Sequence, residues 1–110
     1  MYPKIAPMPG LSLLQIDDPE QVMDHQQDQE LRACEARRAE ILELMQKHHV
    51  VMLHIQPWGR GNYCEEDNSP VTGCEMRFNH LPEDGARAAL NLMADMEKLV
   101  GFWMHPMEWA

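Results

Sequence analysis

Hydrophobic and polar positions change their spacing several times along the chain, and each change predicts a different element. The first strong signal is the run Asp18-Pro19-Glu20-Gln21, which places an N-cap acceptor before a proline at the first helical position and a glutamine at the capping-box position. We expect one helix over residues 19–47, because apolar residues recur on one side at helical spacing. The residues of this stripe are Leu31, Cys34, Ile41, Leu42 and Met45.

The first half of this predicted helix has a different character. Residues 24–30 read DHQQDQE and contain no apolar side chain. A helical turn without an apolar side chain gains nothing from packing on a hydrophobic core. We therefore expect these two turns to stand in solvent or to face something outside the domain.

Two segments with a period of two follow the helix. The alternation over residues 49–57 and again over residues 72–79 predicts two strands, and the simplest arrangement pairs them antiparallel. Residues 11–16, LSLLQI, could add a short edge strand. The side chains that share an apolar face are Val51, Leu53 and Ile55 in the first strand and Cys74, Met76 and Phe78 in the second.

A second helix is predicted over residues 82–100, with a continuous apolar stripe and Gly101 as its stop. The chain of 110 residues is thus expected to form a single α+β domain of the order helix-strand-strand-helix. Its small antiparallel sheet would have two or three strands, with both amphipathic helices on one face. Residues 1–17 would form an extended arm and residues 58–71 a long loop.

The last ten residues, 101–110, contain one Phe, two Trp and two Met directly after the helix stop. A segment this apolar is expected to be fixed to the protein, and we favour a position across exposed apolar surface of the sheet. The alternative is an interface with a partner or with a second copy of the chain, so a homodimer stays open.

Charge and composition exclude several classes of function. Nine Lys and Arg stand against eighteen Asp and Glu, a net charge of −9, and such a chain repels the phosphate backbone of DNA or RNA. No direct nucleic-acid binding is expected. The sequence has neither a membrane-length apolar run nor the pattern of a secretory signal, and its three cysteines are an odd number, so a cytoplasmic protein without membrane contact is predicted.

The loop and the acidic start of the first helix are the candidate partner-binding surfaces. Long loops in small domains are often functional, and acidic side chains suit a basic surface of a protein partner, such as one that binds nucleic acid. In the alternative, the loop is solvated and its aromatic residues fold back onto the sheet. The candidate residues are Trp58, Arg60, Tyr63, Glu65, Glu66 and Asp67 in the loop and Asp24, Asp28 and Glu30 in the helix.

Patterns of known chemistry are incomplete in this chain. Gly59-Arg60-Gly61 lacks the third glycine and the Lys-Ser or Lys-Thr of a phosphate loop, and the acidic run after it lacks the ligand spacing of a calcium loop. The histidines and cysteines near the two strands show no close ligand pair of the kind that zinc sites use. A thiol triad around Cys64 would be flanked by carboxylates that disfavour the thiolate.

We therefore predict a small, acidic, non-enzymatic binding protein without catalytic residues, metal or cofactor. It would inhibit or regulate a protein partner by occupying its surface, as small accessory proteins of phages and mobile elements do. The alternative is a small metal-binding or thiol redox-sensing domain that uses Cys64, Cys74 and nearby histidines.

Overall fold

The protein is described by a computed structural model over residues 12–22, 24–58 and 71–110. Its fold is of the α+β class, as predicted. The elements in chain order are strand β1 (Leu13–Ile16), the 3₁₀ turn η2 (Pro19–Gln21), helices α1 (His25–Ala36) and α2 (Arg38–Lys47), strands β2 (Val50–Trp58) and β3 (Val71–Phe78), helix α3 (Gly85–Val100) and strand β4 (His105–Trp109).

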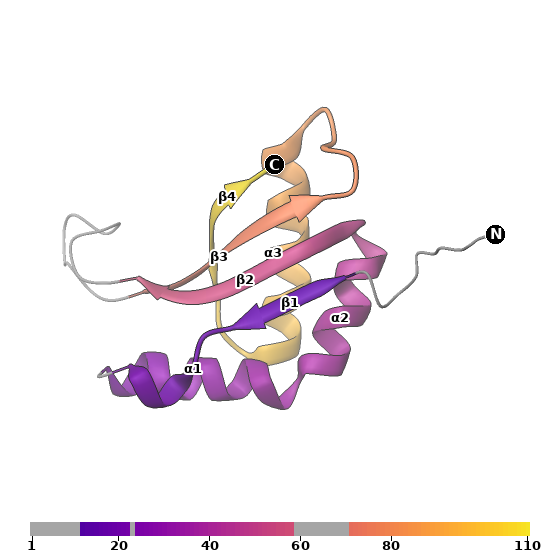
Figure 1. The fold of residues 1–110 in the computed structure, drawn as a ribbon. Helices are drawn as coiled ribbons and strands as arrows, with labels where there is room; N and C mark the ends of the chain where they lie inside the picture. Colours follow the sequence, from indigo (N-terminus) through magenta and orange to yellow (C-terminus); the bar gives the residue numbers. More distant parts are fainter. Residues whose placement is uncertain (1–11, 23, 59–70) are drawn as a thin grey trace.

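The sheet has four strands in the order β1-β2-β3-β4 (Figure 1). The central pair, β2 and β3, is antiparallel as predicted, but both outer strands are parallel to their neighbours. The prediction of a purely antiparallel sheet of two or three strands was therefore wrong. Each outer strand is separated from its neighbour by helices, and a chain that crosses back along a helix adds a strand in the parallel direction.

The C-terminal tail supplies the fourth strand. Gly73 is paired with His105, and Met76 with Trp109. The aromatic side chain of Trp109 packs against the core and lies against Gly85 at the start of α3. The tail thus binds to the protein itself, but as an edge strand and not as a layer across the sheet.

The predicted helix over 19–47 is divided into three pieces. Asp18 caps only a short 3₁₀ turn, because the backbone at Val22 and Asp24 is extended and α1 begins at His25. The side chain of Val22 packs against the core, which fixes the chain in this extended step. A second break lies at Arg37, whose φ and ψ of −114° and 24° depart from helical values.

The helices cover one face of the sheet and share one hydrophobic core with it, as predicted. Because of the break at Arg37, α1 contacts β1, β2 and β3, while α2 packs against β2 and α3. Gly101 ends α3 in the left-handed conformation, with φ of 91°, as its position predicted. No helix in the described part of the chain is long and apolar enough to cross a membrane.

Candidate protein-binding surface

The polar half of α1 packs against the start of β3. The side chain of Gln27 is 5% exposed, and its Nε2 donates a hydrogen bond to the carbonyl oxygen of Val71 at 2.7 Å. The hydroxyl of buried Thr72 donates to Oε1 of Glu30 at 2.6 Å. The expectation that all of residues 24–30 would face away from the domain was therefore wrong. These bonds fix α1 at the point where β3 follows the predicted loop.

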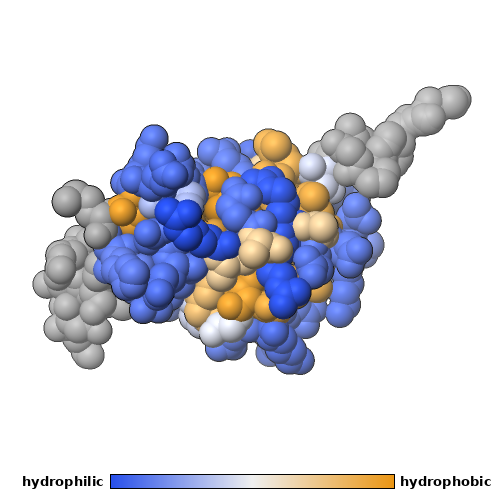
Figure 2. Space-filling model, turned by 90° about the horizontal axis from the view of Figure 1, so that it is seen from below, coloured by the Kyte–Doolittle hydropathy of each residue, from blue (hydrophilic) through white to orange (hydrophobic). Residues whose placement is uncertain are grey.

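An uncompensated negative charge marks the same end of the molecule. Residues 12–31 contain six carboxylates and no Lys or Arg. Asp18 and Glu20 are exposed. Asp24 is half-buried, and its side chain accepts no hydrogen bond from the backbone amides at the start of α1. Asp28 bonds to Arg32 at 2.6 Å, an exposed pair that leaves the region acidic. Seen from the side of α1, hydrophilic residues form most of the surface at this end (Figure 2).

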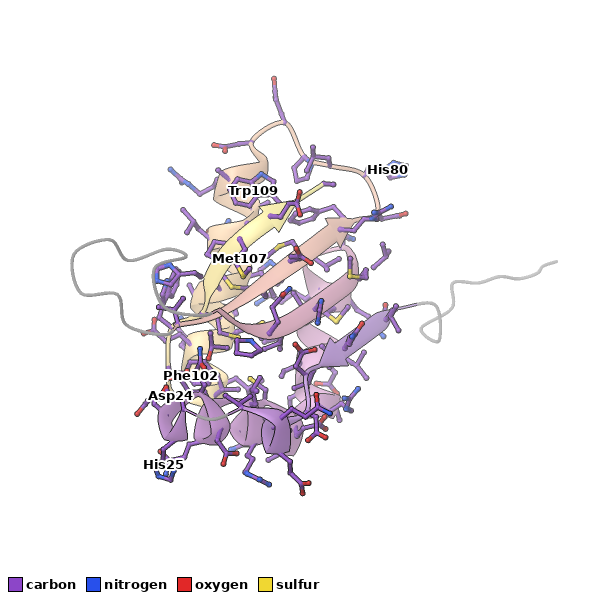
Figure 3. The ribbon with its side chains drawn as sticks, turned by 60° about the vertical axis from the view of Figure 1, so that its left-hand side comes forward. Asp24, His25, His80, Phe102, Met107 and Trp109 are labelled. Carbon is purple, nitrogen blue, oxygen red and sulfur yellow. The ribbon has the colours of Figure 1, made fainter. Side chains whose placement is uncertain are left out.

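An exposed aromatic residue lies at this end as well. Strands β3 and β4 run in the same direction from the pair Gly73 and His105, so the residues just before His105 lie beside the start of β3. Trp103 is one of them, and 37% of its surface is exposed. In Figure 1 the connection from α3 to β4 passes above α1, and in Figure 3 Phe102 of this connection is labelled near Asp24.

These features together form one surface, which we call the loop-end surface. It joins an acidic strip to a partly exposed tryptophan, and tryptophan is the residue type most enriched at binding hot spots. Exposed acidic side chains attract a positively charged partner over distances of several ångströms, and an aromatic side chain adds contact area. Its members are Asp18, Glu20, Asp24, Asp28 and Trp103.

The structure brings together only some of the candidates that the sequence suggested. Asp24 and Asp28 lie on the loop-end surface, whereas Glu30 is held by Thr72. Trp103 was not in the main list of partner-binding residues, although the apolar tail that contains it was kept as an alternative partner interface. Trp58 ends β2 opposite Val71. The Trp58 side chain and Arg60, Tyr63, Glu65, Glu66 and Asp67 lie outside the described residues.

The two described cysteines are core residues, as predicted for Cys74. Cys34 and Cys74 have no exposed surface, and the thiol of Cys74 donates to the sulfur of Met93 at 3.3 Å. Burial raises the pKa of each thiol to about 12. Both side chains therefore stay protonated at neutral pH, and a protonated thiol is a poor nucleophile and metal ligand.

His54 lies on the sheet face opposite the helices and is satisfied by neighbouring polar groups. Its Nε2 is 2.8 Å from Oδ1 of Asp17, and its Nδ1 is 3.2 Å from Nε2 of Gln56. This agrees with the expectation of a strand-face histidine with a hydrogen bond. Among the described residues, no three His, Cys, Asp or Glu side chains are arranged to hold a metal ion.

No model of a known protein family, no curated protein and no solved structure matches this chain.

Proposed function

We propose that this protein is a small, acidic, non-enzymatic binding protein that inhibits or regulates a protein partner by occupying a basic surface on it. The observation that supports this most strongly is the loop-end surface, where the carboxylates of Asp18, Glu20 and Asp24, together with the Arg32-paired carboxylate of Asp28, lie near an exposed tryptophan. Charge complementarity of this kind speeds association and selects the partner, while the aromatic side chain supplies affinity.

The rigid placement of the surface also supports the proposal. Gln27 and Glu30 join α1 to β3, so the acidic strip is fixed against the sheet before a partner arrives. A surface that is already ordered loses less conformational entropy on binding. The alternative of a thiol or metal sensor receives less support, because Cys74 is buried and its pKa is raised to about 12.

The charge requirement is tested by two triple variants with equal changes of charge. In the first, Glu20→Gln, Asp24→Asn and Asp28→Asn neutralise the loop-end surface. In the second, Glu40→Gln, Glu43→Gln and Glu83→Gln neutralise carboxylates elsewhere. The pair is matched, because Asp28 and Glu40 each lose one exposed partner, Arg32 and Arg37 respectively.

Each variant and the unchanged protein would be used as bait in an extract of the source cells, and retained proteins would be identified by mass spectrometry. We expect a basic protein that the unchanged chain and the second variant retain and that the first variant loses. Equal retention by both variants would contradict the proposed surface.

The aromatic contribution is tested by Trp103→Ala. Because Trp103 is partly exposed, we expect a small change in the melting temperature and a loss of about 2 kcal/mol or more in binding free energy, as at interface hot spots. Trp58→Ala, measured in the same way, separates two roles in the loop. A partner anchor loses affinity, whereas a lid on the sheet loses about 3 kcal/mol of stability. Unchanged affinity in both variants would leave the surface without an aromatic anchor.

A further inference from the structure

A cavity lined by three histidines lies at the opposite end of the hairpin from the loop-end surface. It has a volume of about 290 Å³ and lies where α2 ends and β3 leads into the turn before α3. In Figure 3, His80 lies at this end, far from His25 on α1. The lining residues are His48, His49, Phe78, Asn79, His80 and Pro82.

One of these histidines occupies a backbone conformation that normally belongs to glycine. His49 has φ of 61°, and among the described residues it is the one non-glycine residue with positive φ. A side chain in this conformation is strained, because its Cβ lies too close to the following carbonyl oxygen. The backbone is held there by the amide of Asn79, which donates to the carbonyl of His49 at 2.8 Å. Glycine adopts this conformation without strain, so a histidine at this position lowers the stability of the fold.

A second histidine is held in place by a carboxylate from the neighbouring helix. Nε2 of His48 is 2.7 Å from Oδ2 of Asp95, which also accepts from Lys47 at 3.1 Å. The hydrogen bond with His48, followed by that with Lys47, holds the pKa of the Asp95 carboxyl below its usual range. The contact with Asp95 fixes the imidazole ring of His48 in place.

The cavity wall is chemically suited to a small anion with a hydrophobic group. No carboxylate lines it, whereas imidazole rings and the side-chain amide of Asn79 offer N–H donors. Phe78 and Pro82 add apolar surface. The cavity volume of about 290 Å³ lies at the lower end of the range of small-molecule sites, about 300–1,000 Å³, so a phosphate joined to one ring is of suitable size.

The charged side chains on the surrounding elements do not line the cavity, and Asp95 is already bonded to His48. At the end of α2, the carbonyls of Leu44 and Gln46 accept from the amides of His48 and His49, so they do not face the cavity unpaired. These surrounding charged residues are Lys47 on α2, Arg77 on β3, Glu83 and Asp84 in the turn, and Asp95 on α3.

We propose that this cavity is a binding site for a small organic phosphate, held by N–H donors of His48, His49, His80 and Asn79 with its organic group against Phe78 and Pro82. The site is separate from the proposed partner surface. Its success or failure therefore leaves the proposed function untouched.

The test is an NMR titration of the full chain with inorganic phosphate and with phenyl phosphate, using phenol as the neutral control. We expect saturable shifts at residues 48–49 and 78–82 for both phosphates, with tighter binding of phenyl phosphate. Phenol alone should not saturate.

Three variants make the result specific. His80→Gln and His49→Gly should each weaken phenyl phosphate binding about tenfold, as expected for one charge-assisted hydrogen bond of roughly 1.4 kcal/mol. His25→Gln, at an exposed position of α1, should bind phenyl phosphate as the unchanged protein does. His49→Gly should also melt at a higher temperature, because glycine relieves the strained backbone.

The combination of higher stability and weaker binding in His49→Gly is the decisive result, since a purely structural histidine would give no loss of binding. The proposal is overturned if neither phosphate gives saturable shifts at these residues, if His49→Gly binds as tightly as the unchanged chain, or if His25→Gln loses as much affinity as His80→Gln.

Discussion

Replacement of Gln27 by alanine should destabilise the protein far more than the same replacement two positions later. Gln27 is 5% exposed and bonds to the Val71 carbonyl, whereas Gln29 on the same helix is exposed. The two variants share the same change in helix propensity, so that contribution cancels in the comparison. What remains is the contact between α1 and the start of β3.

The size of the effect follows from the contacts that are lost. Leaving the half-buried Val71 carbonyl without its donor costs about 1 kcal/mol or somewhat more, toward the lower part of the range of about 1–3 kcal/mol for buried groups. The loss of buried methylene adds about 0.8 kcal/mol. Release of the glutamine side chain returns about 1–2 kcal/mol of conformational entropy. We therefore expect Gln27→Ala to lower the free energy of unfolding by about 1.5 kcal/mol, and Gln29→Ala to leave it within about 0.5 kcal/mol of the unchanged protein.

Urea denaturation followed by circular dichroism measures both values, and the melting temperature should fall by about 6 °C for Gln27→Ala at about 4 °C for each kcal/mol. Thr72→Val provides an independent check, because it removes the hydroxyl that donates to Glu30 while keeping the shape of the side chain. Equal stability of Gln27→Ala and Gln29→Ala would refute the reasoning that polar contacts fix α1 against β3.

Three further predictions concern the core, the thiols and acid stability. Leu92→Asp places a charge where no surface is exposed and should lower the free energy of unfolding by about 3–5 kcal/mol in a denaturation experiment. Leu90→Asp, at a position 45% exposed, should change the free energy of unfolding little. Equal effects would mean that the assignment of the buried face of α3 is wrong. In a Cys64→Ser variant, Cys34 and Cys74 should react with a thiol reagent at neutral pH only after denaturant is added, since burial raises the pKa of both thiols to about 12; rapid reaction of the folded variant would contradict this. Because the pKa of Asp95 is lowered in the folded protein, its carboxylate stabilises the fold at neutral pH, and this stabilisation is lost as the pH falls through the lowered pKa. Asp95→Asn should therefore be less stable than the unchanged protein at neutral pH and equally stable in strong acid. A difference in stability that is the same at all pH values would assign the effect to packing.

The elements that could be predicted from sequence are those whose local pattern agrees with their final environment. Helix α3 has an apolar stripe on one side and a glycine at its end, and both are used in the fold. In the central hairpin the alternate residues Leu53, Ile55, Cys74, Met76 and Phe78 are buried as predicted, but a register irregularity between Val50 and Met52 buries Val50 and leaves the predicted face residue Val51 half-buried. In these elements local preference and burial point to the same structure.

Other features depend on contacts between distant segments. Strand β4 contains Pro106, which is tolerated because the strand lies at an edge. The break at Arg37 has no proline or glycine to mark it, and it follows from fitting one helical segment around two neighbours. The bond between Gln27 and Val71 joins residues 44 positions apart, so DHQQDQE could only be interpreted as solvated.

The candidate site shows the same limit. The acidic character of residues 17–30 was visible in the sequence, but the distinction between Glu30, which bonds to Thr72, and Asp24, which does not cap its helix, required the structure. The tail that contains Trp103 was an alternative interface in the sequence, but only the pairing of β4 with β3 places the tryptophan beside the start of that strand.

The central claim, that the acidic loop-end surface binds a basic protein, is tested most directly by the salt dependence of affinity for the captured partner. Isothermal titration calorimetry would compare the unchanged chain with the two triple variants over a range of salt concentrations. We expect affinity to fall steeply with salt for the unchanged chain and for the Glu40, Glu43 and Glu83 variant, and to be weak and nearly independent of salt for the Glu20, Asp24 and Asp28 variant. An affinity of the unchanged chain that does not vary with salt, or the same salt dependence in all three proteins, would contradict the claim.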